Sequence, residues 1–258
     1  MAIERIEIYD VDGNLVSYNE VTTNDLTNEE LLLIQQQNEI NNPLNVSMVE
    51  MFSLENNWIG RTVINSTLGL PCIWNGDNWV NTLGVIVYDI LFHDNFESGN
   101  LNKWNVLNDE CNGWYVGVGE RLTGSYSVYI SGDGGYTSNY TGTCSDVSHI
   151  YFDVNIPSDL KDIRLTYTWK CEGEISKDFM NVYNIPKNIT PEIGVELDDI
   201  YEIGIGDHSD NHIWKEERVS LDNALIGDRR IVFSWLNDSS TSNMLAACID
   251  NVYLEYIK

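Results

Sequence analysis

Basic residues are scarce in this chain of 258 residues, which carries 14 Lys and Arg against 40 Asp and Glu and has a formal net charge of −26. Proteins that bind nucleic acids draw much of their affinity from Lys and Arg contacts to phosphates. The shortage therefore argues against binding to bare DNA or RNA, and equally against binding to an anionic membrane surface. The acidic excess supplies carboxylates for a hard cation such as Ca²⁺, although a solvated acidic surface accounts for most of them.

Long apolar runs are also missing from the sequence. No stretch reaches the length that a membrane-spanning helix needs, and residues 1–16 lack the basic region and apolar core of a signal peptide. We therefore expect no membrane insertion. We also expect a protein that is made and kept in a cytosol, or released by a route other than ordinary secretion.

The cysteines form no short-spaced pair. Zinc sites commonly use ligands a few residues apart, and disulfides belong mainly to oxidising compartments. An odd number of scattered cysteines without an export signal therefore favours free thiols over disulfides and over a zinc site. The five are Cys72, Cys111, Cys144, Cys171 and Cys248.

Catalytic motifs are absent as well. The sequence contains no G-x-S-x-G elbow, no P-loop, no H-E-x-x-H and no G-x-G-x-x-G after an expected strand. Pairs of carboxylates are frequent, but 40 acidic residues produce such pairs by chance. We expect no enzymatic activity, with a polysaccharide depolymerase left open as a hypothesis.

What the chain does have is the pattern of a mainly β protein. It contains 8 Trp and 14 Tyr, residues that favour pleated sheets. After residue 90, short β-runs alternate with turn residues and predict a β-sandwich over 91–258. Residues 1–90 are predicted to form a small α+β region, with a hairpin at 3–9 and 15–18 and a helix at 24–41.

The predicted helix carries apolar residues seven apart, at Leu26, Leu33 and Ile40. This spacing fits a short seam between subunits, but two heptads are too few to establish a coiled coil, and ordinary packing on a sheet is the favoured alternative. We therefore expect residues 1–90 to anchor the protein and to contribute to oligomerisation.

Residues 65–84 contain a Trp-rich turn, in which Trp74 and Trp79 flank Asn75-Gly76. This stretch resembles a small β-turn element of bacteriophage tail-fibre and virion-appendage proteins, where it often lies beside a trimer axis. The resemblance implies an oligomer interface at Trp74 and Trp79. An ordinary Trp-rich hairpin remains the alternative.

Residues 94–104 and 246–254 read as the opening and closing motifs of one module, with Gly113–Gly117 and Gly124–Gly132 between them. The module resembles the jelly-roll family of MAM, choice-of-anchor, cleaved-adhesin and carbohydrate-binding domains. The resemblance implies a structural Ca²⁺ held by Glu97 and Asp250, with Asp94 as a weaker candidate. The alternative is that these carboxylates cap turns or accept backbone hydrogen bonds.

Exposed aromatic residues are the expected contacts if the module binds a glycan, because their rings stack on sugar faces. The candidates are Trp104, Trp114, Tyr136 and Tyr140, with core packing as the alternative. His208 and His212 are four residues apart, a spacing that suits a pair of metal ligands only on a helix. This stretch is not expected to be helical, and we expect a hairpin loop there.

These expectations combine into one main hypothesis, a head-fibre or tail-fibre subunit of a tailed-phage virion. The composition resembles that of crAss-like phage proteins. A homotrimer would assemble in the host cytoplasm, contact capsid or tail proteins through residues 1–90, and present the jelly roll on the virion surface for attachment to a host glycan. A carbohydrate-binding or adhesin module of a bacterial surface protein is the alternative.

Overall fold

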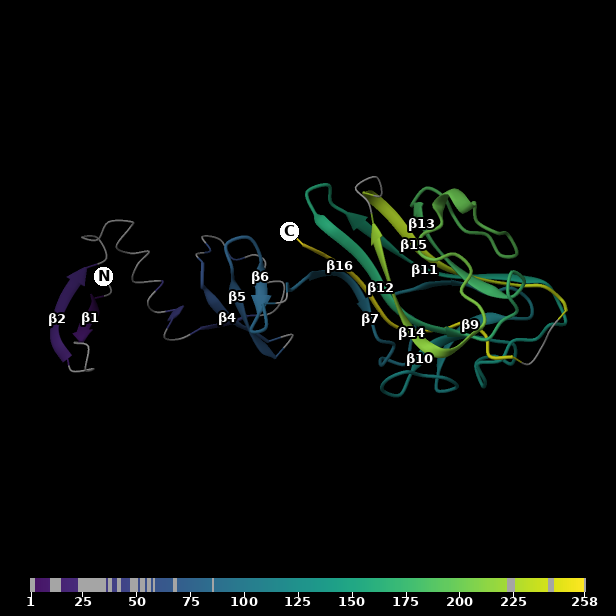
Figure 1. The fold of residues 1–258 in the computed structure, drawn as a ribbon, viewed down its shortest axis with the longest axis horizontal. Coiled ribbons are helices and arrows are strands. Elements are labelled where there is room, and N and C mark those ends of the chain that lie inside the picture. The colour runs from purple at the N-terminus through teal and green to yellow at the C-terminus, as the bar shows by residue number, and fades with distance from the viewer. Residues whose placement is uncertain are drawn as a thin grey trace. The chain divides into compact units, whose positions relative to one another are not determined.

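The computed structural model describes residues 3–9, 15–22, 36, 39–40, 43–46, 51, 54, 57, 59–66, 69–84, 86–221, 226–240 and 244–257. The chain forms two compact units, Met1–Val87 and Tyr88–Lys258 (Figure 1). Within the described residues, no helix is long and apolar enough to cross a membrane.

The first unit contains a hairpin and a small sheet. The hairpin pairs β1 (Ile3–Tyr9) with β2 (Leu15–Thr22), as the sequence predicts. The sheet has the order β3-β4-β5-β6, formed by Leu44–Val46, Thr62–Asn65, Leu70–Trp74 and Trp79–Asn81. Most of the predicted helix at 24–41 lies outside the described residues, where Gln36, Glu39 and Ile40 alone are seen as helical.

The hairpin between β5 and β6 follows from its turn residues. Gly76 adopts a φ of 112°, which side chains rarely tolerate. The side-chain oxygen of Asn75 accepts hydrogen bonds from the backbone N–H groups of Asp77 and Asn78. The two strands therefore bring Trp74 and Trp79 opposite one another.

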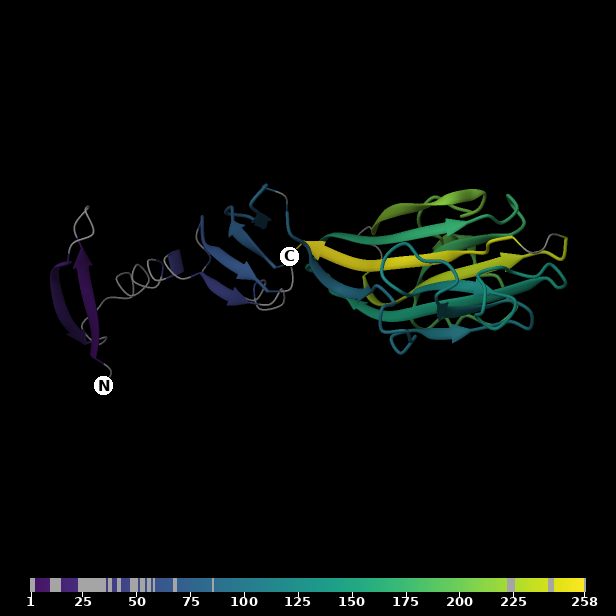
Figure 2. The ribbon, with the colours of Figure 1, turned by 90° about the horizontal axis from the view of Figure 1, so that it is seen from below.

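The second unit is a β-sandwich of two antiparallel sheets, which confirms the predicted fold class (Figures 1 and 2). One sheet has the order β14-β12-β16-β10-β9, with β7 also paired to β16, and the other has the order β13-β15-β11-β8. The strands are β7 (Asp89–Asp94), β8 (Asn105–Leu107), β9 (Gly113–Gly117), β10 (Ser127–Ser131), β11 (Asp146–Ile156), β12 (Lys161–Cys171), β13 (Phe179–Pro186), β14 (Asn211–Leu221), β15 (Gly227–Asn237) and β16 (Cys248–Ile257), and a 3-10 turn η1 spans Asp199–Tyr201.

The core lies between these two sheets. Alternate residues of β12 and β15 point inward, among them Leu165, Tyr167 and Phe233, which are fully buried. Phe92 of β7 stacks on Phe152 of β11, with ring centroids 3.6 Å apart. Apolar side chains on one face of each strand thus hold the layers together and leave the opposite face of the six-stranded sheet free for polar residues.

One cysteine pair corrects the sequence prediction. Cys111 and Cys144 form a disulfide, with their Cα atoms 6.5 Å apart, although they are 33 positions apart in the sequence. The prediction failed because the two residues become neighbours only when the loops before β9 and β11 meet. The other three, Cys72, Cys171 and Cys248, are free, as expected, and their side chains are buried.

Candidate functional site

A groove lies on the outer face of the six-stranded sheet. Its pocket has a volume of about 490 Å³ and is contributed mainly by β12, β14, β16 and the loop between β9 and β10. It is lined by Leu122, Thr123, Thr166, Thr168, Glu216, Arg218, Asn251, Tyr253 and Glu255. All of these side chains are polar except the aliphatic Leu122 and the aromatic Tyr253.

One row of side chains crosses the sheet through this groove. Thr166 of β12 pairs with Arg218 of β14 on one side and with Tyr253 of β16 on the other, and Tyr253 pairs with His93 of β7. Directly paired residues point to the same face of an antiparallel sheet. The imidazole of His93 stacks on the Tyr253 ring with centroids 4.3 Å apart, so the ring is braced from one side.

Two polar atoms in this row have no hydrogen-bond partner among the described residues, Thr166 Oγ1 and His93 Nε2. Thr166 is only 8% exposed, so burial of its hydroxyl without a partner costs free energy. Burial also lowers the pKa of His93, which favours the neutral imidazole. Unsatisfied polar atoms therefore flank Tyr253 on both sides.

The charged residues of the groove are arranged in pairs. Arg218 Nε donates to Glu216 Oε1 at 2.7 Å, and Arg164 Nε donates to Glu255 Oε1 at 2.6 Å. The guanidinium of Arg164 also lies 3.6 Å from the centroid of the Tyr88 ring. Opposite charges thus offset one another along the groove, which presents both hydrogen-bond donors and acceptors.

A β-bulge forms one rim of the groove. The register between β12 and β16 shifts between Thr166 and Thr168, and Asn251 adopts a φ of 52° there. A bulge of this kind re-aims a side chain, and Asn tolerates the left-handed conformation better than most residues. Asn251 consequently lines the groove, and its Nδ2 donates to Thr123 Oγ1 at 3.3 Å.

Two of the three residues predicted to bind Ca²⁺, Glu97 and Asp250, lie where the β9–β10 loop meets the sheet. Glu97 accepts hydrogen bonds from the backbone N–H groups of Ser125 and Tyr126 at 2.9 Å. These bonds lower the pKa of Glu97. The buried Asp94 accepts from the Phe96 N–H and from Trp104 Nε1, both at 2.9 Å. Each of these carboxylates is thus engaged by protein donors, and the Ca²⁺ site remains a prediction.

The predicted aromatic ligand residues separate into two groups. Trp104, Trp114 and Tyr140 are buried, so the prediction of glycan stacking is wrong for these three, because their rings complete the core. Trp114 Nε1 donates to the Ser148 carbonyl at 3.2 Å, and the Tyr140 hydroxyl donates to Asp178 at 2.6 Å.

Tyr136 behaves differently from these three, since it is 86% exposed. It follows Gly134 and Gly135 in the loop after β10. Asp133 organises this loop by accepting hydrogen bonds from Ser131 Oγ at 2.6 Å and from the Thr137 N–H at 2.9 Å. Tyr136 is therefore displayed by an ordered loop and remains a candidate contact.

The predicted interface residues of the first unit are only partly described. Leu26 and Leu33 lie outside the described residues, and Ile40 is exposed. Trp74 and Trp79 pack edge to face with centroids 5.7 Å apart. Trp79 is buried by its own unit, which leaves Trp74 as the more accessible ring. An interface between subunits remains a prediction at these positions.

The two histidines of the 206–212 segment do not face one another as a metal pair. His208 is buried, with its Nε2 2.7 Å from the Tyr167 hydroxyl and its Nδ1 3.0 Å from the Met180 carbonyl. His212 is exposed and lies 3.4 Å from Glu172. His208 is thus a core residue of this segment, consistent with the expected loop.

None of the residues that line the groove is predicted from the sequence, because no local motif marks them. Thr166, Arg218 and Tyr253 come from three strands far apart in the sequence and share a row only through sheet register. The one available signal was the alternation of polar and apolar residues in 164–170, which marks the outer face of that strand.

Neither a protein-family model nor a curated protein matches this chain. Among solved structures, it is similar to the CBM22-1 xylan-binding domain of Xyn10C from Paenibacillus barcinonensis, at 12% identity and a TM-score of 0.40, covering 67% of this chain and 97% of that one. It is also similar to the K1 cleaved adhesin domain of Lys-gingipain from Porphyromonas gingivalis W83, at 12% identity and a TM-score of 0.37, covering 63% and 96%.

A further similarity is to tailspike protein 4 of bacteriophage CBA120, at 13% identity and a TM-score of 0.37. It covers 63% of this chain but only 20% of the tailspike chain. Likenesses this distant do not establish what the present chain binds.

Proposed function

We propose that Tyr88–Lys258 is a non-catalytic glycan-binding module that holds a neutral polysaccharide in the groove. The observation that carries this proposal is the hydroxyl of Thr166, on a residue 8% exposed in the row that crosses the groove, which has no hydrogen-bond partner in the described part of the chain. A buried hydroxyl without a partner is costly unless a ligand satisfies it. A sugar hydroxyl can both donate to and accept from Thr166 after a small movement of the side chains above it.

The remaining chemistry of the groove suits a carbohydrate. Sugars combine apolar C–H faces with many hydroxyl groups, and ligand sites match them with an apolar surface and a few placed polar groups. Tyr253, braced by His93, supplies the aromatic surface. Thr168, Asn251 and the two ion pairs supply donors and acceptors around it.

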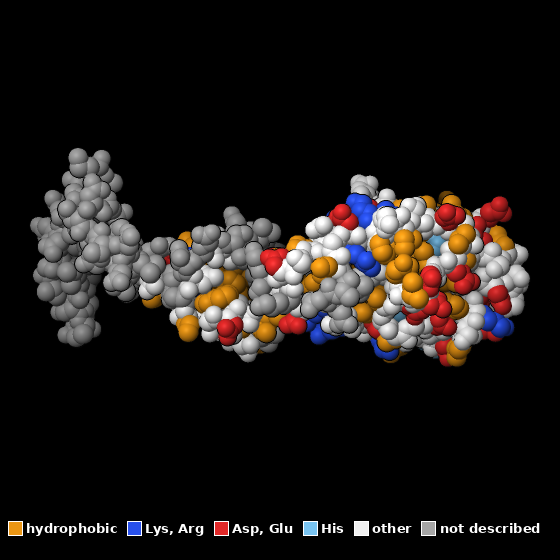
Figure 3. All heavy atoms as spheres, turned by 90° about the horizontal axis from the view of Figure 1, so that it is seen from above, with side chains coloured by type: hydrophobic (Ala, Val, Ile, Leu, Met, Phe, Trp, Pro, Cys, Tyr) orange, Lys and Arg blue, Asp and Glu red, His pale blue; other side chains and the backbone are white. Residues whose placement is uncertain are grey.

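Electrostatics favours a neutral glycan over an anionic one. The groove pairs each of its carboxylates with an Arg, so it offers no excess positive charge. Figure 3 shows acidic side chains scattered over one face of this unit, and the whole chain carries a net charge of −26. A polyanionic chain would be repelled at long range.

The same ion pairs argue against hydrolysis. Glycoside hydrolysis requires one carboxylic acid that donates a proton and a second carboxylate as base or nucleophile. Glu216 and Glu255 each accept a hydrogen bond from an Arg guanidinium, so neither carboxyl group of the groove is free to face a glycosidic bond. We therefore propose binding without turnover.

The test is a titration of the full chain with soluble xylan, mixed-linkage β-1,3-1,4-glucan and β-1,4-galactan, followed by calorimetry. Thr166→Val removes the hydroxyl and keeps the branched shape. We expect binding of the preferred polysaccharide to weaken by about threefold to tenfold, the value of one hydrogen bond, with no loss of thermal stability.

Ser234→Ala is the matched control, because Ser234 Oγ is likewise buried without a partner among the residues that the structure describes, but belongs to β15 in the other sheet. It should leave binding unchanged. Equal glycan binding by the wild type and by Thr166→Val would show that the groove is not the binding site. Failure of all three polysaccharides, followed by failure on a broad array of neutral glycans, would overturn glycan binding itself.

We further propose that this module serves a fibre or appendage of a tailed-phage virion, as the attachment part of a homotrimer at the virion surface. Support comes from residues 65–84, whose resemblance to virion elements rests on the Trp74–Trp79 hairpin, and this hairpin forms. Capsid or tail proteins would contact residues 1–90. The mass of the protein in solution tests the proposed homotrimer.

A further inference from the structure

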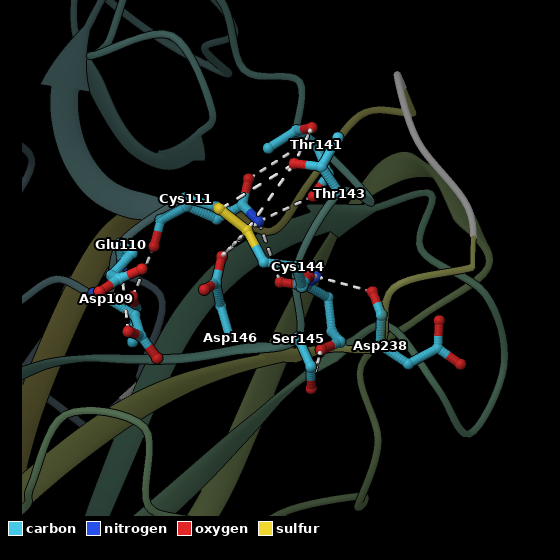
Figure 4. Close-up of a disulfide and its surroundings, with 12 residues drawn as sticks. Asp109, Glu110, Cys111, Thr141, Thr143, Cys144, Ser145, Asp146 and Asp238 are labelled. Carbon is cyan, nitrogen blue, oxygen red and sulfur yellow. Dashed lines mark hydrogen bonds between the residues drawn. A yellow bond between two sulfur atoms is a disulfide. The ribbon is translucent and has the colours of Figure 1, made fainter.

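Cys111, Cys144 and Asp146 form a cluster at the ends of two strands, and none of the three lines the groove. Cys111 precedes β9, Cys144 precedes β11, and Asp146 is the first residue of β11. Their two Sγ atoms and one carboxylate oxygen all lie within 4.8 Å of one another. Figure 4 shows the Asp146 carboxylate directed toward the sulfur pair.

The carboxylate of Asp146 is held in place by its surroundings. Asp146 is only 2% exposed. Asn112 Nδ2 donates to its Oδ2 at 2.8 Å. Asn112 is itself fixed, because its Oδ1 accepts from the Thr141 N–H at 2.8 Å and its Nδ2 also contacts the Asn237 side-chain oxygen at 3.1 Å. Outer contacts of this kind orient metal ligands in proteins.

The two sulfurs differ from the other thiols of the chain in access. Cys111 and Cys144 are partly exposed, whereas Cys72, Cys171 and Cys248 are buried. Burial raises the pKa of Cys171 to about 12, which disfavours the thiolate that binds metals. A reductant or a metal ion from solution can therefore reach one sulfur pair and not the others.

We propose that the reduced Cys111–Cys144 pair and Asp146 form a zinc site, and that this site and the disulfide are alternative states. Two-electron reduction by a cellular dithiol, which itself becomes a disulfide, breaks the S–S bond and gives two thiols. Binding of Zn²⁺ then releases two protons and leaves two thiolates and one carboxylate as ligands. Water fills the fourth tetrahedral position.

The backbone already suits both states. Tetrahedral Zn²⁺ with Zn–S distances near 2.3 Å needs its two sulfurs about 3.8 Å apart. Cα atoms 6.5 Å apart accommodate that separation by side-chain rotation alone. In a reducing cytosol, the metal would link the two loops that carry Cys111 and Cys144. After release of the protein into an oxidising environment, the disulfide would link the same two loops. Neither state depends on a glycan in the groove.

The experiment uses Co²⁺ and Cd²⁺ as probes, because their thiolate complexes absorb light and Zn²⁺ complexes are silent. The full chain is reduced with a phosphine, freed of reductant without oxygen, and titrated. We expect one equivalent of metal to bind with a thiolate-to-metal absorption band, and one equivalent of Zn²⁺ to displace it. The oxidised protein should give no band.

Variants assign the ligands. Cys144→Ser should abolish the band, and Asp146→Asn should weaken Cd²⁺ binding by at least about tenfold, with folding checked by circular dichroism. Cys72→Ser is the control and should bind like wild type. Absence of a stoichiometric band in the reduced protein would overturn the zinc site, and unchanged affinity in folded Asp146→Asn would remove the carboxylate from it.

Discussion

Thr123 donates its backbone N–H to the carboxylate of Asp250 at 3.2 Å, across 127 positions of the sequence. The N–H of Leu122 donates to the same oxygen, also at 3.2 Å. Asp250 is fully buried in β16, whereas Leu122 and Thr123 line the groove. One carboxylate of the sheet thus fixes the loop that forms the groove rim.

The first prediction concerns calcium at this loop. Glu97 and Asp250 both hold its backbone, and burial, together with repulsion from the Glu97 charge, raises the pKa of Asp250. A bound Ca²⁺ would relieve that repulsion. We expect the melting temperature of the wild type to be higher in millimolar CaCl₂ than in EDTA, by several degrees, as measured by calorimetry.

Glu97→Gln and Asp250→Asn should each abolish this difference. Glu172→Gln, which changes a carboxylate on another loop, should retain it. The same melting temperature in CaCl₂ and EDTA would contradict the calcium site, and it would leave the two carboxylates as acceptors for backbone N–H groups alone.

The opening and closing motifs show how far the sequence could go. The resemblance of these motifs to a known family implies that Glu97 and Asp250 belong to one region, and both side chains accept hydrogen bonds from the β9–β10 loop. The pairing of Thr166 with Tyr253 could not be predicted from the sequence. The register between β12 and β16 depends on a bulge at Asn251, and no local sequence pattern predicts this bulge. The pairing of Cys111 with Cys144 was missed for the same reason, as it depends on where two loops meet.

The second prediction is a loss of stability in mild acid caused by His208. Burial lowers its pKa to about 4, against the ordinary value of 6.5. The folded state keeps this imidazole neutral, while the unfolded state binds a proton below pH 6.5. The contribution of His208 to the free energy of unfolding is therefore fully present above pH 6.5. As the pH falls toward 4, this contribution is lost, by roughly 3 kcal/mol.

Urea unfolding of the wild type between pH 7 and pH 4 measures this effect. His208→Asn should be less stable at pH 7, because it loses the contact to Tyr167, but its stability should fall less steeply with acid. His212→Asn is the control, since His212 is exposed, and it should follow the wild type. An identical slope for His208→Asn and wild type would show that His208 is not the titrating group.

The third prediction is that Trp104 acts in the core. Its ring packs edge to face against Phe92 and Phe152, both at centroid distances of 5.2 Å, and its Nε1 donates to the buried Asp94. Trp104→Ala should lower the free energy of unfolding by about 3 to 5 kcal/mol. Denaturant titration measures this change, and a loss below about 0.5 kcal/mol would contradict the core assignment.

The aromatic residues also mark a limit of sequence reasoning. Trp104, Trp114 and Tyr140 were as plausible on a surface as in a core, because aromatic side chains with polar tips occur in both places. Their tips reach Asp94, the Ser148 carbonyl and Asp178, partners that exist only after the sheets have packed. Burial of polar aromatics is a tertiary property.

The fourth prediction assigns Tyr136 to binding. Its ring is 86% exposed, so removing it forfeits little packing. Tyr136→Ala should change the free energy of unfolding by less than about 0.5 kcal/mol and should weaken glycan binding in the calorimetric titration. Val118→Ala, another exposed position on the same unit, serves as the control. Full affinity in Tyr136→Ala would exclude Tyr136 as a contact.

The last prediction addresses oligomerisation of the full chain, measured by light scattering. The fibre hypothesis expects a mass three times that of the 29.4 kDa chain. Trp74 is the accessible ring of the hairpin pair, and if it lies at the trimer axis, Trp74→Ala should shift the mass toward monomer at micromolar concentration. Ile59→Ala, an exposed residue of the same unit, should not. A monomeric wild type would contradict the trimer and make the free-standing glycan-binding module the better reading, because the groove is built within one chain.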